Sequence, residues 1–392
     1  MTTKNILPAD GYAGTLVGRA LFPGAHPGPC VVVIREDGVH NISGTVPTMA
    51  ELLNCDNPIA RANKATRNCV HLGSLDEILL NSTPDTHDPL KPYLLTPIDL
   101  HAVKGCGMTF VKTMLGRAIE EQAQGDPQKA DAMHKVLEGD EGRKLSTVKP
   151  GSDEAEKLKA ALIEQGMWSQ YLEAGIGPNV GIFTKAQPLS TVGIGAEVGI
   201  HPDSIKSHSE PEVVLITNSR GRSIGATLGN DVNRQDLEGL SALYLDRAKN
   251  NNAACSIGPF IRLFDESFGI DDVRTQNVTL TVEGIDGYLL SEIYPMVEMT
   301  RSLDELVAQT FNDNHQYPDG LALFCGTMFF PDQDRDEPGK GFTHKIGDVV
   351  TIKAPALGTL INKVNHSNMV RPWNFGIADL MNNLADRHLI GG

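Results

Sequence analysis

Three acidic residues in the second half of the chain have the types and spacing of a divalent-cation site. Glu210 and Glu212 flank Pro211 at the start of a predicted strand, where alternation places both side chains on one face. Residues 218–221 predict a tight turn, so the strand that returns from it would bring Asp231 against the two glutamates. Converging carboxylates repel one another unless a cation binds them, and all-oxygen ligation suits Mg²⁺, with Mn²⁺ as a substitute, better than Zn²⁺. A structural Ca²⁺ site is the competing interpretation.

A lysine further along the chain is the candidate to balance the charge of this site. Three carboxylates and one Mg²⁺ leave one negative charge in excess, so an anionic substrate needs a compensating cation. Lys249, eighteen positions after Asp231, is that candidate. The alternative is an ordinary surface lysine, since lysines are usually exposed.

The composition argues against several other classes of protein. The 392-residue chain is long enough for one large domain and a smaller one. Its formal net charge of −15 argues against nucleic acid or an anionic membrane as a partner, because both attract clustered Lys and Arg. There is no signal-peptide pattern, no apolar stretch of membrane length and no Cys-x-x-Cys pair among the six cysteines. We therefore expect a cytoplasmic protein with reduced thiols.

The elements that must position the carboxylates can be outlined from the sequence. Residues 13–46 carry short β-branched runs separated by Gly and Pro, which predicts a small β-rich module. Two helices are predicted after Thr48 and Ser74, each of which is followed three positions later by Glu, as in a capping box. The stretch from Thr83 to Pro97 is the predicted connection to the second part.

The second part is predicted to be a helical segment followed by many strands. From about Arg117 to Leu172 the sequence is charged and helical, with start signals at Asp126-Pro127 and Ser152-Asp153, which is typical of a packed helical insert. One further helix is predicted from Ser302. The predicted strands are 213–216, 224–228, 277–282, 288–293, 321–330, 349–352 and 359–364. This pattern favours an α+β fold with a folded-over mixed sheet or barrel rather than alternating βαβ units.

The spaced residues resemble the signature of a known family. The pattern Glu210-x-Glu212, Gly225-x-Thr227-x-x-Asn230-Asp231-Val232, Asp236 and Lys249 is similar to that of the fumarylacetoacetate hydrolase family, over about residues 95–365. The resemblance implies a C-terminal mixed β-roll at residues 93–392 with a helical insert at 117–175, and a smaller β-rich N-terminal domain at residues 1–92. It further implies a homo-oligomer, either a dimer or a tetramer.

The same resemblance assigns roles to individual residues. The three carboxylates would bind Mg²⁺, and Lys249 would reach the substrate beside the metal. Gly326-Thr327 and Gly358-Thr359-Leu360 resemble the later strands that line the pocket, where Thr327 and Thr359 would contact the substrate.

Within the family, the spacing is similar to that of the 2-keto-3-deoxy-sugar-acid dehydratases. Asp231 follows Glu212 by nineteen positions, whereas hydrolase members carry a longer metal hairpin. The run Gly105-Cys106-Gly107-Met108-Thr109-Phe110 resembles the dehydratase segment that meets the substrate, so Phe110 is predicted to bind it. Hydrolase members carry a water-activating His-x-x-Glu pair, and none of the twelve histidines here is followed by Glu at the third position.

Two positions depart from the dehydratase pattern. Met114 stands where those enzymes carry an arginine, and the nearest arginine is Arg117. Gly181 stands where they carry a glutamate, directly before the run Ile182-Phe183-Thr184-Lys185. Arg117 and Lys185 are predicted to bind the substrate. The candidates to supply the missing carboxylate from the helical insert are Glu120, Glu121 and Glu173.

The resulting hypothesis is a dehydratase that converts a 2-keto-3-deoxy-D-pentonate, a 2-oxo acid, to 2,5-dioxopentanoate (α-ketoglutarate semialdehyde) in non-phosphorylative pentose catabolism. Mg²⁺ would stabilise the enolate formed when a C3 proton leaves. Lys249 would neutralise the substrate carboxylate or shuttle the proton, and Thr359 would orient the substrate. The alternatives are a C–C hydrolase of 2,4-diketo acids, in which His201 or His208 would activate water, and a non-catalytic binding protein with a retained metal site.

Overall fold

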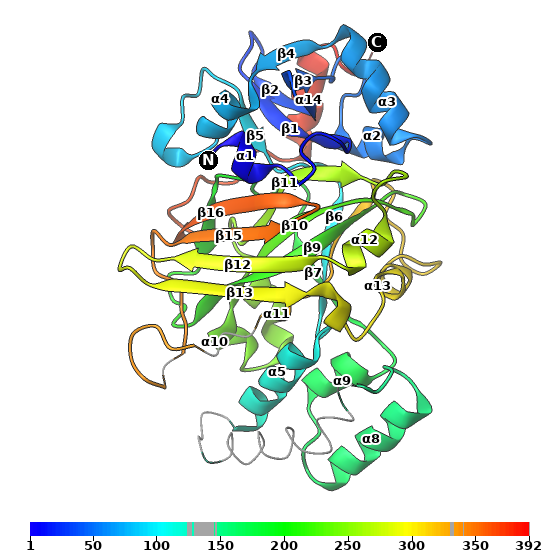
Figure 1. The fold of residues 1–392 in the computed structure, drawn as a ribbon, viewed down its shortest axis with the longest axis vertical. Helices are drawn as coiled ribbons and strands as arrows, with labels where there is room; N and C mark the ends of the chain where they lie inside the picture. Colours follow the sequence, from blue (N-terminus) through cyan, green and yellow to red (C-terminus); the bar gives the residue numbers. More distant parts are fainter. Residues whose placement is uncertain (124–127, 129–144, 146, 330–332, 340, 392) are drawn as a thin grey trace.

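Two mixed β-sheets lie at the centre of the molecule, between an N-terminal module and a group of helices (Figure 1). A computed structural model describes residues 1–123, 128, 145, 147–329, 333–339 and 341–391. The order of strands in the larger sheet is β4 (Val70–Gly73), β3 (Gly38–Asn41), β2 (Gly28–Arg35), β1 (Leu16–Phe22), β11 (Cys255–Leu263), β10 (Ser223–Arg234), β9 (Ser207–Thr217), β14 (Leu321–Phe324), β6 (Ala102–Gly107) and β7 (Gly181–Ala186), with β5 (Tyr93–Leu95) paired to β1. The order in the smaller sheet is β13 (Leu289–Pro295), β12 (Asn277–Glu283), β15 (Val349–Ala354), β16 (Gly358–His366) and β8 (Glu197–Ile200).

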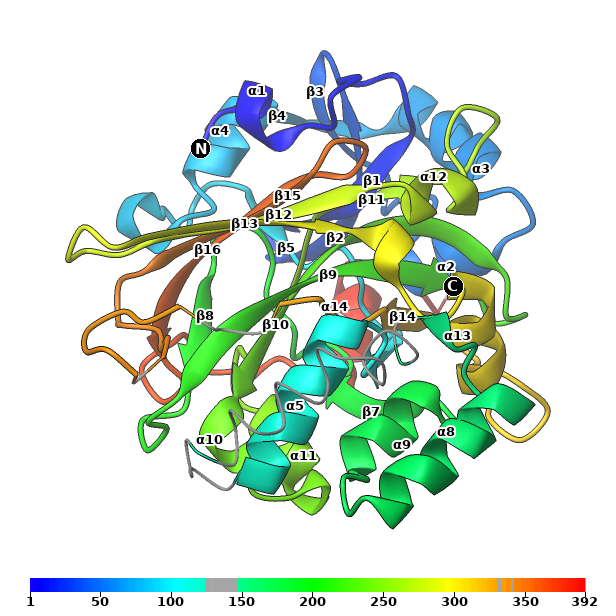
Figure 2. The same cartoon turned by 60° about the horizontal axis from the view of Figure 1, so that its bottom comes forward.

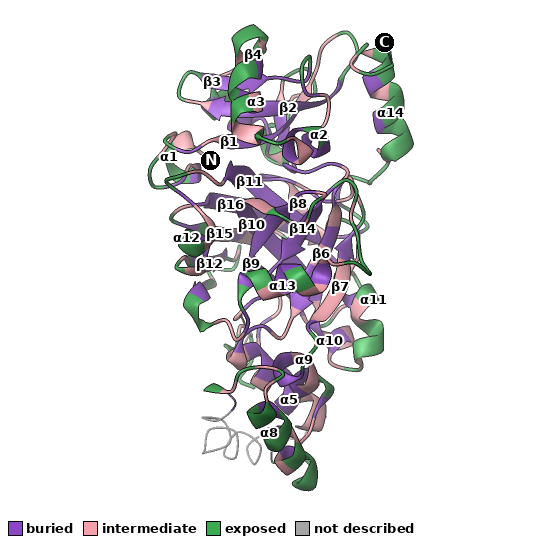
Figure 3. Ribbon diagram, turned by 90° about the vertical axis from the view of Figure 1, so that its right-hand side faces the viewer, coloured by how far each residue is buried: buried purple, intermediate pink, exposed green. Residues whose placement is uncertain are grey.

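The two sheets share one hydrophobic core. Val213 and Leu228 of the larger sheet belong to the same buried cluster as Leu280 and Ile352 of the smaller one. Most neighbouring strands are antiparallel, but β14 runs parallel to β6 and β16 runs parallel to β8. Figure 3 shows the central strands largely buried, whereas exposed residues lie mainly on the helices and loops. The predicted α+β fold with a mixed β-roll is confirmed.

The N-terminal β-rich module is continuous with the larger sheet. Strand β1 pairs with β11 through Leu16 and Arg262, so strands from both halves of the sequence share one ladder. The predicted helix caps are present, since Thr48 caps α2 (Met49–Asn54) and Ser74 forms a capping box with Glu77 on α4 (Leu75–Leu80). The other helices at this end are α1 (Thr3–Ile6), α3 (Pro58–Ala65) and α14 (Ile377–Asp386).

The last helix returns to the N-terminal module. Helix α14 packs against β2, and the Asn383 side chain donates a hydrogen bond to the Pro27 carbonyl at 2.8 Å. Because α14 packs on β2 and β1 pairs with β11, residues from the second half of the chain contact the N-terminal module directly. The proposed division between residues 92 and 93 stays a prediction.

The helical insert has a small core of its own. It contains α5 (Val111–Ala123), α8 (Asp153–Glu164) and α9 (Gln170–Ile176), which lie together below the sheets (Figure 2). The Ser152 cap of α8 is confirmed, and the predicted start at Asp126-Pro127 lies outside the described residues. The buried apolar residues of the insert are Met114, Ala118, Ile119, Leu145, Leu158, Leu162, Leu172 and Ile176. None of the described helices is long and apolar enough to cross a membrane.

Several elements differ from the sequence prediction. The predicted strand at 321–330 ends at Phe324, because Gly326 adopts a φ of +94° that a strand does not allow. Strand β11 was not predicted, although all of its residues are buried. The predicted helix after Ser302 is confirmed as α13 (Leu303–Thr310). The short helices α10 (Gln235–Glu238), α11 (Leu245–Lys249) and α12 (Ile270–Arg274) were missed, as were α1, α3 and α14.

A buried polar network fixes the loop before β15 to the start of β9. The His344 ring contacts the Ser209 hydroxyl through Nε2 and Asp348 through Nδ1, each at 3.0 Å. Asp348 also accepts two hydrogen bonds from Arg335, at 2.6 and 2.8 Å. Burial would raise the pKa of Asp348, but Arg335 and His344 lower it to about 2. This network holds the residue next to Glu210.

Asp348→Asn should lower the free energy of unfolding by about 3 kcal/mol, because it removes the buried anionic partner of Arg335 and leaves this buried cation paired with the partly exposed Asp286. The contribution of the ionised Asp348 to the free energy of unfolding is present above its unfolded-state pKa of about 3.9. This contribution is lost as the pH falls through about 2. Urea unfolding at pH 7 measures the loss. The matched control is Asp336→Asn, whose exposed pair with Lys345 should contribute less than about 1 kcal/mol. Equal losses of stability in the two variants would contradict the role of Asp348 as the buried partner that stabilises Arg335.

Candidate active site

The β9–β10 hairpin brings the three predicted carboxylates together. Asn218 fixes its turn, since its Oδ1 accepts hydrogen bonds from two backbone amides beyond it. The register pairs Asp231 directly with Glu210, and Glu212 lies two residues along the same face. One oxygen from each carboxylate lies within 4.8 Å of the others, and all three side chains are buried. The prediction of the hairpin is confirmed, although Asp231 lies inside β10 rather than beyond its end.

Glu210 is surrounded by donors. Its Oε1 accepts from His208 at 3.1 Å, from Asn233 at 3.0 Å and from Arg117 at 3.5 Å, while Oε2 is paired with the Lys249 ammonium. Burial alone would raise the pKa of Glu210, but Lys249, His208 and Arg117 together hold it well below its ordinary value. Burial lowers the pKa of His208, so its ring is neutral at pH 7. Glu210 is therefore ionised and firmly oriented.

The negative charges of Glu212 and Asp231 are less fully balanced by neighbouring donors than that of Glu210. The Glu212 carboxylate accepts one hydrogen bond, from the Gly326 amide at 2.6 Å, and burial together with repulsion from Asp231 and Glu210 raises its pKa well above the ordinary value. Asp231 pairs with Lys185 at 2.7 Å and Lys249 at 3.3 Å, yet burial still raises its pKa. A divalent cation would remove this repulsion, and an all-carboxylate donor set fits Mg²⁺. The residues present therefore fit the predicted metal.

Lys249 lies at the end of α11, between two of the carboxylates. Its side chain is 3% exposed, so the alternative of an ordinary surface lysine is wrong. Burial would lower the pKa of Lys249, but Asp231, Glu210 and Glu238 raise it above the ordinary value, so the side chain is an ammonium at neutral pH. This arrangement supplies the buried positive charge that an anionic substrate needs.

A cavity of about 170 Å³ opens beside the three carboxylates. Its walls come from β6 and β7, the helical insert, the α10–α11 segment and the chain after β14. Besides the three carboxylates, the lining residues are Cys106, Gly107, Met108, Thr113, Arg117, Gln170, Tyr171, Ala174, Gly181, Ile182, Phe183, Glu238, Ala242, Leu245, Lys249, Gly326 and Thr327.

Comparison with known proteins places this geometry in a family. The model of the fumarylacetoacetate (FAA) hydrolase C-terminal family matches residues 169–365, about half of the chain, and this stretch contains the three carboxylates and Lys249. The chain belongs to this family. The family assignment from the sequence is thereby confirmed.

Relatives of known name cover part of the chain. A probable 2-keto-3-deoxyxylonate dehydratase of Haloferax volcanii is 31% identical over 201 residues, which is 51% of this chain and 65% of that protein. A 2-dehydro-3-deoxy-D-arabinonate dehydratase of Saccharolobus solfataricus is 32% identical over 183 residues, 47% of this chain and 58% of that protein. The chain thus matches less than two thirds of the length of either curated relative.

Solved structures of family members share the fold over most of the chain. The apo form of a 2-keto-3-deoxy-D-arabinonate dehydratase superposes with a TM-score of 0.60 at 20% identity and covers 90% of this chain and 99% of that one. A structure of a 2-keto-3-deoxy-D-arabinonate dehydratase complexed with magnesium and 2,5-dioxopentanoate gives a TM-score of 0.58 at 21% identity, with the same coverage. At these identities the likeness shows the fold alone.

Glu238 is the functional candidate that the sequence analysis missed. Among the described residues, it is the only carboxylate outside the metal trio that lines the cavity. It is 4% exposed, its Oε2 lies 2.9 Å from Arg117, and it accepts a hydrogen bond from Asn233. The signal was an acidic residue seven positions after Asp231, but a sequence does not show that a short helix turns it inward.

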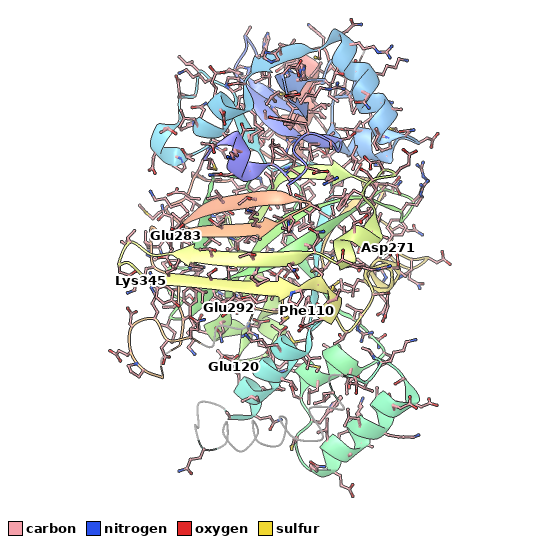
Figure 4. All side chains as sticks on the ribbon, viewed as in Figure 1. Phe110, Glu120, Asp271, Glu283, Glu292 and Lys345 are labelled. Atoms are coloured by element: carbon pink, nitrogen blue, oxygen red, sulfur yellow. The ribbon has the colours of Figure 1, made fainter. Side chains whose placement is uncertain are left out.

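The carboxylates predicted in the insert have other partners. Glu120 pairs with Arg117 at 3.0 Å, Glu121 accepts from Gln170, and Glu173 pairs with Lys159 at 2.6 Å. None of the three lines the cavity. Figure 4 labels Glu120 on α5, below the strands. The carboxylate absent at Gly181 is therefore not replaced from these positions.

Arg117 and Thr327 lie where the substrate prediction needs them. Arg117 is 1% exposed and contacts both Glu210 and Glu238 while lining the cavity. Thr327 follows Gly326 in the cavity wall, and its carbonyl accepts a hydrogen bond from Thr113 at 2.7 Å. Their contact with substrate stays a prediction.

The structure does not bring three other predicted residues to the cavity. Lys185 is fully buried behind Asp231, where its ammonium also binds the Val232 carbonyl at 3.2 Å, so its place is that of a positioning residue. The Phe110 side chain, labelled in Figure 4, belongs to the buried core, and its backbone forms an isolated β-bridge with Met299. Cys106, Gly107 and Met108 line the cavity instead.

Thr359 is likewise distant from the predicted role. It is the second residue of β16, opposite Lys353, and Gly358 before it lies so close to Ile6 of α1 that a Cβ would be 2.3 Å from that residue's carbonyl oxygen. Successive strand residues point to opposite faces, so Thr359 points away from this contact; it is buried and does not line the cavity. Of the two Gly-Thr pairs predicted to line the pocket, Gly326-Thr327 is the one that reaches the cavity beside the carboxylates.

Glu212→Gln should stabilise the metal-free protein, because it removes a buried charge that repels two others. We expect the melting temperature in EDTA to rise by about 2–4 °C over the unsubstituted protein, and the further rise caused by Mg²⁺ to be lost. Thermal unfolding with EDTA and with Mg²⁺ measures both effects. Glu121→Gln, which alters a carboxylate outside the trio, is the control and should keep the Mg²⁺ response. An unchanged response to Mg²⁺ in Glu212→Gln would contradict the assignment of this ligand.

Proposed function

We propose that this chain is a Mg²⁺-dependent dehydratase that converts a 2-keto-3-deoxy-D-pentonate to 2,5-dioxopentanoate. The observation that carries the proposal is the buried trio of Glu210, Glu212 and Asp231 beside a cavity that also presents Lys249 and Glu238. The named relatives, both 2-keto-3-deoxy acid dehydratases, support the choice of substrate class.

The trio and its neighbours have separate tasks in this reaction. Mg²⁺ bound there would polarise the C2 carbonyl and stabilise negative charge that develops on its oxygen. Lys249, held as an ammonium, neutralises the C1 carboxylate, and Arg117 adds a second buried positive charge to the same wall. Lys185 keeps Asp231 in place from behind the cavity.

Glu238 is the residue to which we assign the C3 proton. Its Oε2 lies 2.9 Å from the Arg117 guanidinium, and the carboxylate reaches the cavity from α10. The C3–H bond breaks towards Glu238, and its electrons form the C2–C3 double bond of the enolate. The C4–O bond then breaks, the C2 carbonyl re-forms, and the proton held by Glu238 leaves with the hydroxyl as water. Tautomerisation of the resulting enone with its C5 hydroxyl gives the aldehyde.

Glu238→Gln should lower kcat by about 100-fold or more and change KM little, because the amide keeps the shape but cannot accept the proton. Exchange of the C3 protons of 2-oxopentanoate in deuterated water, which needs the proton transfer but no leaving group, should stop in the same variant. The matched control is Glu120→Gln, since Glu120 also binds Arg117 but does not line the cavity, and its loss should stay below about fivefold. Persistent C3 exchange in Glu238→Gln would exclude Glu238 as the base.

The hydrolase alternative lacks its predicted histidine base at the cavity. His208 is fully buried, and its Nε2 is occupied by Glu210. His201 lies near Asp203 at 3.9 Å, and neither histidine lines the cavity. A non-catalytic binding protein would have no use for a fourth carboxylate that lines the cavity beside the metal trio. Both alternatives therefore have less support than the dehydratase.

A substrate panel tests the reaction directly. Purified protein with Mg²⁺ should form 2,5-dioxopentanoate from 2-keto-3-deoxypentonate without loss of carbon, and EDTA should abolish the reaction. Acylpyruvates, the 2,4-diketo acids of the hydrolase alternative, should remain intact. Product analysis by NMR measures both. Cleavage of acylpyruvates, or no reaction with either class of substrate when Mg²⁺ is present, would overturn the proposal.

A homo-oligomer, either a dimer or a tetramer, and a cytoplasmic location complete the proposal. The family resemblance supports the assembly, and the acidic composition is compatible with a metabolic enzyme of small anions once Lys249 and Arg117 supply local positive charge.

A further inference from the structure

A second cluster of reactive side chains lies in the N-terminal module, at the end of the molecule away from α10 and α11 (Figure 1). Asp37 lies in the turn between β2 and β3, His40 lies on β3, and Cys69 directly precedes β4. The β3–β4 ladder, in which His40 pairs with His71, brings the three together although 32 positions separate the first from the last.

The three side chains form a continuous chain of contacts. The His40 Nε2 atom lies 2.8 Å from the Asp37 carboxylate, and Nδ1 lies 3.3 Å from the Cys69 sulfur. With its proton on Nε2, the imidazole donates to Asp37 and leaves the lone pair of Nδ1 facing the thiol. Carboxylate, imidazole and thiol in this order are the parts from which an activated nucleophile is built.

Exposure is graded along this chain. The Asp37 side chain is 72% exposed, His40 is buried, and Cys69 is partly exposed. The imidazole is thus held in place by the fold, while the sulfur can be reached from solvent. The thiol donates its single proton to the Thr66 carbonyl at 3.2 Å, so the S–H bond must turn to Nδ1 of His40, 3.3 Å from the sulfur, before the proton is transferred.

We propose that Cys69 is a reactive thiol that is activated by His40 and Asp37 and serves as a site of covalent modification by electrophiles and hydroperoxides. The thiol proton moves to Nδ1 of His40, and Asp37 stabilises the imidazolium. With a hydroperoxide, the sulfur attacks the terminal oxygen, which carries the hydrogen, and the O–O bond breaks. The leaving alkoxide takes the proton from His40. The products are the sulfenic acid of Cys69 and an alcohol, and a thiol can reduce the sulfenic acid back.

The other cysteines provide an internal comparison. Cys30, Cys106, Cys255 and Cys325 are buried, and burial raises the pKa of each of these thiols. Cys55 is partly exposed like Cys69, but burial raises the pKa of its thiol, and no described histidine contacts it. Cys55 is therefore the matched reference for exposure without activation.

Few other charged groups surround the cluster. His71 approaches the His40 ring edge-on at 5.2 Å, and its Nε2 contacts the Asp37 carbonyl at 2.8 Å. From the preceding segment, Lys64 and Arg67 are exposed. Asp37 is consequently the one described acid that contacts His40.

Alkylation of the full-length protein tests the proposal. Limiting iodoacetamide at pH 7, followed by peptide mass spectrometry, gives the rate at each cysteine in the same sample. We expect Cys69 to react at least about tenfold faster than Cys55, because the thiolate is the reacting form and only Cys69 has an imidazole nitrogen, Nδ1 of His40 at 3.3 Å, to accept its proton. His40→Asn should remove most of this advantage, and Asp37→Asn should reduce it severalfold.

Two further measurements keep the result decisive. His71→Asn removes a neighbouring ring that does not touch the sulfur and should change the rate at Cys69 by less than about threefold. Asp37→Asn alters an exposed turn residue, so it remains informative even if His40→Asn unfolds, which a melting curve detects. Hydrogen peroxide followed by dimedone should label Cys69 before Cys55. Equal rates at Cys69 and Cys55, or a Cys69 rate unchanged in Asp37→Asn and His40→Asn, would overturn the proposal.

Discussion

Mutual repulsion among three buried carboxylates is the constraint on which the rest of the site depends. The strand register places Asp231 beside Glu210, and alternation adds Glu212 on the same face. Coulomb energy between unit charges at such separations is several kcal/mol even at an effective dielectric constant of about 20. Lys185 and Lys249 offset part of it, but burial and repulsion from Asp231 and Glu210 keep the pKa of Glu212 high, and no lysine of the described residues forms an ion pair with it. The arrangement is therefore complete only with a divalent cation.

Other elements of the fold bring charged groups of both signs to this hairpin. The chain leaves β10 into α10 and α11, two short helices that place Glu238 and Lys249 on the same cavity. The insert supplies Arg117, which connects Glu210 with Glu238. Because these charges are buried together, a change in one alters the position or ionisation of the others. The metal trio and Glu238, the carboxylate to which we assign proton transfer, thus interact electrostatically as one group.

The sequence allowed part of this site to be predicted, and the division has physical reasons. The trio followed from strand alternation and a turn at Asn218, which are local rules, and Lys249 from charge balance. Glu238 was missed because its inward direction depends on a four-residue helix that has no periodic pattern of its own. Lys185 was predicted to bind substrate, but its position behind Asp231 depends on the pairing of β6 with β7, a tertiary relation that motif spacing does not reveal. The shared ladder of β1 and β11 was invisible for the same reason.

The most direct measurement of the metal site is an anomalous difference map from crystals grown with Mn²⁺, recorded at the manganese absorption edge. The account predicts one strong peak within coordination distance, about 2.1–2.2 Å, of carboxylate oxygens from Glu210, Glu212 and Asp231, with Lys249 beside it and not bound to it. A map with no peak between these carboxylates, or with manganese bound only elsewhere, would contradict it.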